Sequence, residues 1–417
     1  MSTPAQAPNL RAVFKLKDFR KLWLAQFVSI FGDFLALFGV ISLITFRLHG
    51  NVVQVTYVTI AFMLPLAFVG PVAGVFVDRW RVKRVMIASD VIRAFLALSL
   101  VWVTDVRQIC VIFFLLSTVS AFFGPAQSVT LRTLVPKENL LAANAMMSQA
   151  FYTVRILSPL LAGQLVAWLT EKSCFYLDSF SFFFSAAMVG TLIILRPPTP
   201  PNPNAHPLKA FWSDLKAGNT FIYSHASLAF VVMAMTTAMF VMACFAPLIS
   251  IYVRDSLAAG VRLYGVISSA VGVGLIVGTQ VVNKVVGSKS KDQVVLMGLF
   301  ALALAVSALG FFPNIPMAGV GTFGMGFAIA FIIVPAQTLM QTETPPAMIG
   351  RVSSSFMSSI SFAQVFGMLL SGYLAQALGM RNLFKTCAVA LAVISLLGYL
   401  RRRARTPLTP APEAASD

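Results

Sequence analysis

Asp33 is a carboxylic acid inside an apolar segment at about residues 22–46. It stands about eleven residues into that segment, or about 16 Å along a helix, which is near the middle of a hydrocarbon layer about 30 Å thick. A carboxyl group at this depth must be neutral, paired or in contact with water. Asp33 therefore suits a group that binds and releases protons; the alternative is a structural hydrogen bond to a neighbouring helix.

Arg155 lies at a similar depth in the apolar segment at about 141–169, so its guanidinium must face the interior of a helical bundle. It suits a counter-charge to Asp33 or to an anionic group of a bound molecule. The alternative is a fixed structural ion pair or a carbonyl ligand. Pairing with Asp33 would oppose protonation of that acid, so a proton switch would require the two to separate.

For the other polar residues within apolar segments, a structural role is the main interpretation. Asp90 and Arg93 are three residues apart on one helix face, and we expect them to brace the preceding turn. Asp178 is expected to be an interfacial residue. Gln337 and Gln364 offer hydrogen bonds without charge to a cavity. The segments of the C-terminal half contain no Asp or Glu, so a proton carrier is expected in the N-terminal half.

The elements that position these residues are apolar segments long enough to cross a membrane. Of the 417 residues, 58% are hydrophobic and 11% are charged, against about 25% charged in soluble domains. The pattern predicts an all-α membrane protein with twelve transmembrane helices in two six-helix bundles. The segments lie at about 22–46, 53–77, 85–104, 107–130, 141–169, 174–195, 220–252, 262–283, 293–312, 316–340, 352–378 and 384–400.

Basic residues orient these helices. The turn at Gly70–Arg84, GPVAGVFVDRWRVKR, carries like charges that cannot lie in hydrocarbon, and it is predicted to be cytoplasmic. The loops on its side of the membrane hold roughly three times as many Lys and Arg as those on the other, which predicts that both termini are cytoplasmic. The net charge of +17 lies in short loops and at the termini, which argues against a nucleic-acid partner.

The chain divides into two similar halves. Residues 1–195 form the predicted N-terminal bundle, 196–216 a proline-rich cytoplasmic linker in an extended form, 217–400 the C-terminal bundle and 401–417 a tail. Pro125-Ala126-Gln127 recurs 210 residues later as Pro335-Ala336-Gln337, which predicts two repeats related by an axis along the membrane normal. Gly274 and Gly278 form a G-x-x-x-G pattern that predicts close helix packing.

Twelve segments in two repeats resemble the major facilitator superfamily over essentially the whole chain. The family's loop motif G-x-x-x-D-R-x-G-R-R is similar to Gly74, Asp78, Arg79 and Lys83, with Arg81 and Val82 in place of the glycine and first paired arginine. The resemblance implies that Asp78 meets a helix N-terminus of the opposite half. It also implies that Arg79 and Lys83 hold phosphate headgroups or acidic partners.

Within that superfamily, four stretches resemble the drug–proton antiporter-3 group, which includes macrolide and siderophore exporters: IFGDF, SDVIRA, LVPKENLLAANA and RILSPLLAG. The last is similar to the fifth-helix antiporter motif through Ser158, Pro159 and Gly163, whereas the fourth segment lacks the arginine of many proton antiporters. The resemblance implies a monomeric, multi-pass protein of the bacterial inner membrane. It implies multidrug efflux of lipophilic, macrolide-like molecules by proton-coupled alternating access, with no cofactor besides the proton gradient.

Other functions stay open at this point. A siderophore or metabolite exporter and a lysophospholipid flippase are alternatives within transport, and a non-transporting membrane scaffold or sensor is one outside it. No phosphate loop, hydrolase elbow or H-E-x-x-H motif occurs, so we do not expect an enzyme. The Cys and His residues are scattered without ligand spacing, so no metal site is expected.

Overall fold

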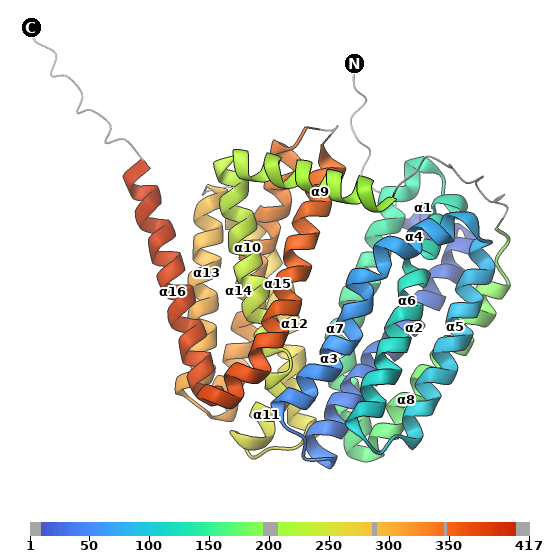
Figure 1. Ribbon diagram of the computed structural model, residues 1–417, viewed down its shortest axis with the longest axis horizontal. Helices are drawn as coiled ribbons and strands as arrows, with labels where there is room; N and C mark the ends of the chain where they lie inside the picture. Colours follow the sequence, from blue (N-terminus) through green and yellow to red (C-terminus); the bar gives the residue numbers. More distant parts are fainter. Residues whose placement is uncertain (1–9, 195–206, 286–289, 346–347, 406–417) are drawn as a thin grey trace, which may run out of the picture.

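The computed structural model describes residues 10–194, 207–285, 290–345 and 348–405, and within these ranges every regular element is helical. Two groups of long, roughly parallel helices lie side by side (Figure 1). We call the end at which α1 begins and α16 finishes the basic end, and the other the far end. The basic end is the one that the sequence predicts to be cytoplasmic.

The N-terminal bundle follows the apolar segments of the first half. Apart from the second, the spans begin and end within a few residues of the predicted limits, and the first span finishes in a π-helical turn, η1 (Leu43–Arg47). The predicted second span, 53–77, is wrong as a single helix, because it is divided at Val69. The predicted turn at Gly70–Arg84 is helical over Gly70–Arg79. The helices of this bundle are α1 (Leu10–Lys15), α2 (Lys17–Ser42), α3 (Val52–Phe68), α4 (Gly70–Arg79), α5 (Val82–Ser99), α6 (Val106–Leu134), α7 (Leu140–Trp168) and α8 (Glu171–Gly190).

The C-terminal bundle repeats this plan with one added surface helix. Its helices are α9 (Pro207–Ser224), α10 (Ala226–Phe245), α11 (Leu248–Asp255), α12 (Val261–Val285), α13 (Lys291–Phe311), α14 (Ile315–Glu343), α15 (Ile349–Leu378) and α16 (Met380–Arg405). Helices α6 and α14, which carry the repeated Pro-Ala-Gln, are each 29 residues long. The repeat seen in the sequence is therefore a repeat of structure.

The prediction of twelve membrane-crossing helices is confirmed. Eleven helices are long and apolar enough to span a bilayer, and the second span is a shorter apolar helix at Val52–Leu66. The seventh predicted segment, 220–252, is wrong as a single helix, because α9, α10 and α11 divide it. His225 starts a new helix after α9, and Pro247 precedes α11, where a proline interrupts the hydrogen bonding of a continuous helix.

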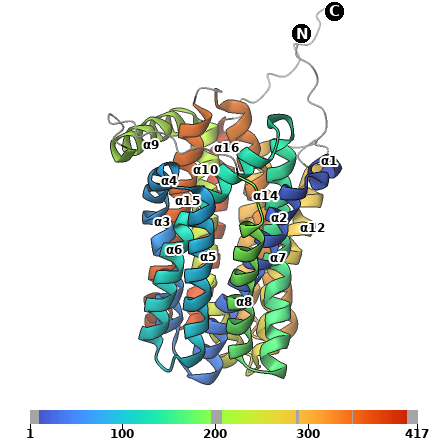
Figure 2. The same cartoon turned by 90° about the vertical axis from the view of Figure 1, so that its right-hand side faces the viewer.

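Helix α9 corrects the predicted limit of the linker at residue 216. Residues 195–206 lie outside the described residues, but the helix begins at Pro207, because proline is well accommodated in the first turn of a helix. Figures 1 and 2 show α9 lying across the basic end, roughly perpendicular to the spans. Asp214 Oδ1 lies 2.8 Å from Arg351 Nε of α15, and Ser355 Oγ donates to the Leu215 carbonyl at 2.9 Å.

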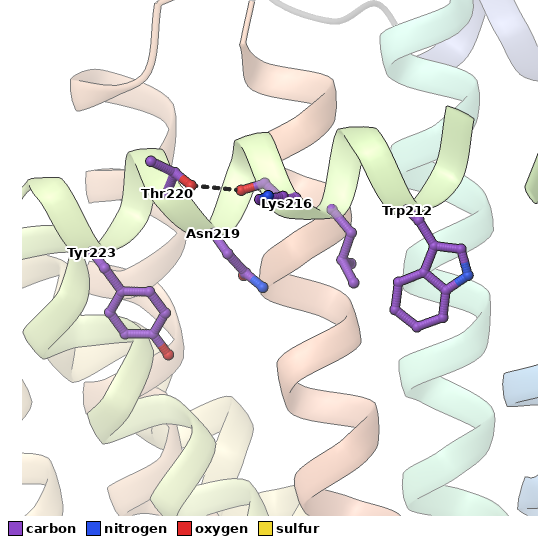
Figure 3. Close-up of a pocket in the computed structure, with 6 residues that line it drawn as sticks. Trp212, Lys216, Asn219, Thr220 and Tyr223 are labelled. Carbon is purple, nitrogen blue, oxygen red and sulfur yellow. Dashed lines mark hydrogen bonds between the residues drawn. The ribbon is translucent and has the colours of Figure 1, made fainter. Parts of the chain in front are cut away.

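The face of α9 opposite to Asp214 carries residues that are typical of a membrane interface. Trp212, Asn219 and Tyr223 point to the same side of the helix, beside Lys216 (Figure 3). The side chains of Trp212 and Tyr223 are 64% and 62% exposed. Large amphipathic rings at a helix surface are typical of the headgroup level of a bilayer. Helix α9 therefore lies where the basic end meets the lipid.

The two bundles meet mainly in the far-end half. Helix α7 packs on α12 and α3 on α15 across the bundle boundary, and η1 contacts α11. A Cβ on Gly265 would lie 2.5 Å from the Pro159 carbonyl, so only glycine fits where α12 crosses α7. Near the basic end, the pronounced contact between bundles in the described residues is α4 with α9. The molecule is therefore closed at the far end and held more loosely at the basic end.

Glycines also set the tightest helix contact within the C-terminal bundle. A Cβ on Gly274 of α12 would overlap the Phe323 carbonyl of α14, and a Cβ on Gly326 of α14 would overlap the Val271 carbonyl of α12. Such small-residue contacts let backbones approach closely in lipid. The predicted packing role of Gly274 and Gly278 is confirmed.

We expect Gly326→Ala to destabilise the protein by about 1–3 kcal/mol, because the added methyl group forces α12 and α14 apart. The matched control is Gly319→Ala on the same helix, where no described atom beyond the helix's own backbone lies within 4 Å of the new Cβ. The measurement is the temperature at which half of the purified protein is lost as a monodisperse species in detergent. Equal midpoints for the two variants would contradict the packing role.

Candidate functional site

A group of charged side chains is buried inside the N-terminal bundle, and we call it the Asp–Arg cluster: Asp33 of α2, Asp90 and Arg93 of α5, and Asp178 of α8. Arg93 Nη1 lies 3.8 Å from Asp33 Oδ2, and Arg93 Nη2 donates to Asp90 Oδ1. The side chains of Arg93 and Asp90 are 4% and 0% exposed, whereas that of Asp33 is 32% exposed. Asp33 is thus the member of these pairs that water reaches.

Aromatic rings hold the guanidinium of Arg93 in place. Its Cζ lies 4.6 Å from the ring centre of Phe123 on α6 and 4.3 Å from that of Phe182 on α8. Ser120 of α6 accepts a long hydrogen bond from Nη1, at 3.5 Å. Arginine keeps its charge and stacks favourably on aromatic faces, so this setting fixes a permanent cation among α2, α5, α6 and α8.

Asp178 lies beside these residues and corrects the prediction of an interfacial role. It is 1% exposed, and a Cβ on Gly32 would stand 2.6 Å from its Oδ1. Gly32 precedes Asp33 in α2, so the glycine admits a second carboxyl next to the first. Ser181 Oγ lies 3.5 Å from Asp178 Oδ1. The spacing of Asp178, Ser181 and Ser185 on one helix face was the signal in the sequence for a buried polar stripe.

The cluster contains three carboxyl groups and a single guanidinium. If all four groups were ionised, negative charge would exceed positive in a buried site, which is strongly unfavourable. Asp90 Oδ2 and Arg93 Nε also have no hydrogen-bond partner among the described residues. The arrangement therefore suits a site at which at least one carboxyl binds a proton.

The structure corrects two predictions about charge pairing. Asp33 pairs with Arg93 and not with Arg155, for which no ion pair occurs in the part of the chain that the structure describes. Asp90 and Arg93 do pair as predicted, but they do not brace the preceding turn, because their partners lie on α2, α6 and α8.

Arg155 faces the space between the bundles. On one side of Arg155, the surface of α7 carries the buried residues Val154 and Ser158. On its other side lies Ile156, which contacts Gly272 of α12. Leu157 and Leu160 are exposed on the opposite side of the helix. One turn earlier, Phe151 packs on Phe34 of α2 with ring centres 5.7 Å apart. Arg155 is therefore a solvent-exposed cation next to an aromatic wall.

The structure describes only part of the loop motif that follows the second span. Beyond its own helix backbone, no described atom lies within 4 Å of a Cβ built on Gly74, and the side chains of Asp78 and Arg79 lie outside the described residues. Lys83 Nζ donates to the Leu192 carbonyl after α8 at 2.8 Å. This contact uses one of the three ammonium donors inside its own bundle, and the role of Lys83 as a headgroup ligand stays a prediction.

The fifth-helix motif is a contact between bundles. Ser158 is buried, and the Pro159 carbonyl and Gly163 face Gly265 of α12, with the Cβ position of Gly163 3.0 Å from Gly265 Cα. The two glutamines differ: Gln364 Nε2 approaches Met239 Sδ at 3.8 Å, whereas Gln337 is exposed. Neither glutamine belongs to the Asp–Arg cluster.

A set of contacts that the sequence did not reveal closes the far end. Arg254 of α11 donates from Nη1 to the carbonyls of Thr45 at 2.7 Å and Gly50 at 2.8 Å, which belong to the other bundle. Thr45 Oγ1 donates to Ser250 Oγ at 3.0 Å. The hydroxyls of Tyr57 and Tyr373 lie 2.9 Å apart across the same boundary. Thr45 lies in the π-helical turn η1, and hydropathy patterns do not show such a turn.

Comparison with known proteins identifies the family to which this chain belongs. A family described as transmembrane secretion effectors matches residues 9–413. The chain belongs to this family of major facilitator superfamily transporters. It is a multi-pass protein of the bacterial inner membrane, and its family consists of transporters, not enzymes.

Relatives and solved structures agree with this placement. The chain is 27% identical over 398 residues to the uncharacterized MFS-type transporter YfiS of Bacillus subtilis, covering 93% of this chain and 94% of the relative. It is 24% identical to the enterobactin exporter EntS of Escherichia coli O1:K1, covering 96% of each.

Among solved structures, a bacterial homologue of the human lysosomal transporter Spinster, inward-facing and unoccupied, has a TM-score of 0.70 at 12% identity, covering 99% of this chain and 100% of that one. The nucleoside transporter NupG has a TM-score of 0.71 at 12% identity, covering 93% and 99%. These likenesses show the fold of the transporter.

We expect Arg254→Gln to raise the fraction of transporter molecules open at the far end by about tenfold. Glutamine loses the charged donor, and hydrogen bonds to charged groups contribute about 1.5–3 kcal/mol. The measurement is the distance distribution between spin labels at Thr104→Cys and Gly260→Cys in a variant without native cysteines.

Arg262→Gln is the matched control, because Arg262 is an exposed arginine at the start of α12 near the same end. An unchanged distribution in Arg254→Gln, or an equal shift in the control, would reject Arg254 as the residue that holds the far end closed.

Proposed function

We propose that this transporter exports a small organic molecule from the cytoplasm by alternating access, and that inward proton movement through Asp33 drives it. The observation that carries the proposal is the position of Asp33, which is half-buried in a cluster of three carboxyls around one arginine. The relationship to exporters such as EntS supports the direction of transport.

The charge balance supports Asp33 as the proton carrier. Arg93 is enclosed by Asp90 and by two aromatic rings, so the nearer carboxylate already neutralises it. Asp33 lies farther from the guanidinium, at 3.8 Å, and is the more exposed of the two. An acid that is weakly paired and in contact with water exchanges protons more readily than one that is fully enclosed.

Helix α2 gives a physical route from the proton to the gate. Asp33 and Thr45 are on one continuous helix, about 18 Å apart at 1.5 Å per residue. Between them, Phe38 stacks on Tyr264 of α12 with ring centres 4.5 Å apart. Loss of charge at Asp33 weakens its attraction to Arg93, so α2 is released on one side and can shift against α12 and Arg254 on the other.

Asp33→Asn mimics the protonated acid permanently, so we expect it to abolish export driven by a pH gradient. Exchange of cargo across vesicles at equal pH should persist, because exchange needs no net proton movement. The measurement compares both activities in reconstituted vesicles, with Asp292→Asn in the first turn of α13 as the control. Gradient-driven export at the level of the unaltered protein would reject Asp33 as the carrier.

The surroundings of Arg155 support a cargo that combines an apolar or aromatic body with an anionic or acceptor group. The exposed guanidinium lies next to Phe151 and Tyr152, whose rings are 5.7 Å apart, and Phe34 extends this wall. Export of lipophilic, macrolide-like molecules uses the aromatic wall alone. Export of a siderophore-like metabolite uses the wall and the cation, and EntS relatives favour this second candidate.

Arg155→Gln separates these two cargo classes. We expect export of enterobactin from everted vesicles to fall about tenfold, because a charge-assisted contact is lost, while export of erythromycin stays unchanged. Arg155→Lys should restore part of the enterobactin activity. An equal loss for both cargoes would indicate a structural role for Arg155 and would contradict a direct contact with an anionic cargo.

A further inference from the structure

A groove of about 710 Å³ lies on the outer side of the N-terminal bundle, between α5 and α6 and close to the basic end. Arg81 and Arg84 stand at its mouth, and Ala88 and Ile92 of α5 form one wall. Ala88 and Ile92 are exposed, and Phe95 continues the same face with 60% exposure. This face is opposite to the one that carries Asp90 and Arg93, so the groove opens to the membrane and is separate from the Asp–Arg cluster.

The second wall is aromatic and apolar. Val119 and Phe122 of α6 line it, and the Trp80 ring stacks on Phe122 with ring centres 6.0 Å apart at an angle of 19°. Trp80 is 48% exposed. A tryptophan at the end of a span is typical of the headgroup level of a bilayer, which places the mouth of the groove at that level.

The two arginines at the mouth are available for an anion. Both are exposed, and neither has an ion-pair partner among the side chains that the structure describes. A guanidinium binds phosphate oxygens through several fixed N–H donors. Arg81 occupies the position at which the superfamily loop motif has glycine, so this cation is a departure of this chain from the motif.

We propose that the groove binds an anionic phospholipid of the leaflet at the basic end. The phosphate lies between Arg81 and Arg84, the Trp80 ring covers the glycerol region, and an acyl chain runs along Ala88, Ile92 and Val119. Arg84 and Ile92 are eight residues apart, or about 12 Å along α5, which is long enough for a large part of an acyl chain. A free phosphate compound would use the arginines and leave this apolar wall unused.

The site has a structural consequence for α5. Ser89 lines the groove, and the next residue, Asp90, belongs to the Asp–Arg cluster. One helix thus faces lipid on one side and the buried charges on the other. A bound lipid that bridges α5 and α6 stabilises the wall against which Arg93 is held. The inference does not depend on the proposed direction of transport or on its cargo.

The test is native mass spectrometry of the purified full-length protein titrated with palmitoyl-oleoyl phosphatidylglycerol or phosphatidylcholine. We expect tighter binding of phosphatidylglycerol. Arg81→Gln/Arg84→Gln should weaken that binding about 25-fold, at about fivefold per cation, and leave phosphatidylcholine unchanged. Arg132→Gln/Lys137→Gln is the matched control, because it removes two exposed charges elsewhere at the basic end.

A second variant tests the apolar part without touching the arginines. Ile92→Trp places a large side chain in the open groove on an exposed position, so folding is preserved while the acyl chain is displaced, and phosphatidylglycerol binding should fall. Quenching by phosphatidylglycerol brominated on its acyl chain should also be weaker in Trp80→Phe than in the unaltered protein.

Three results would overturn the proposal. Equal binding of the two lipids would show an apolar groove without headgroup recognition. Equal loss in the Arg132/Lys137 control would show unspecific attraction to a basic surface. Full displacement of phosphatidylglycerol by millimolar glycerol phosphate would show a site for soluble phosphate compounds.

Discussion

The N-terminal bundle depends on the contacts that the Arg93 guanidinium makes with its neighbours. An arginine that keeps its charge inside a membrane requires counter-charge or polar partners, and aromatic rings stacked on it stabilise it further. Asp90 of α5, Asp33 of α2, Phe123 of α6 and Phe182 of α8 meet this requirement from four helices. The same requirement brings more carboxyl groups together than one cation neutralises, so the site that stabilises the bundle is also the site that suits a proton.

Helix α2 connects this site with the closure of the far end. Its middle contributes Asp33, and its π-helical end presents the Thr45 carbonyl to Arg254. Both contacts are made by arginines that come from other helices, one in each bundle. A shift of α2 therefore alters two charged contacts together, which is the arrangement that links a local change of charge to a movement between bundles.

The number of spans, the repeat and the Gly274–Gly278 contact were predictable, because length, hydropathy and small-residue spacing are properties of single segments. The partner of Asp33 was not, because Arg93 and Arg155 are equally acceptable until the neighbours of α2 are known. Asp178 was misjudged from its place in the segment, although Ser181 and Ser185 mark its polar face. Arg254 was missed because its partners are backbone carbonyls, which no side-chain pattern reveals.

The two halves share a backbone plan and differ in chemistry. Helices α6 and α14 have the same length and the same internal Pro-Ala-Gln, yet the spans described for the C-terminal bundle hold no carboxyl group away from their ends. That bundle is instead held by glycine contacts such as Gly274 with α14 and Gly326 with α12, which favour a rigid unit. If protons drive transport as proposed, a C-terminal bundle without buried acids in its described spans would confine the response to protons to the N-terminal half. In the proposed mechanism the movement between bundles would start from α2, which contacts the C-terminal bundle at Tyr264 and Arg254.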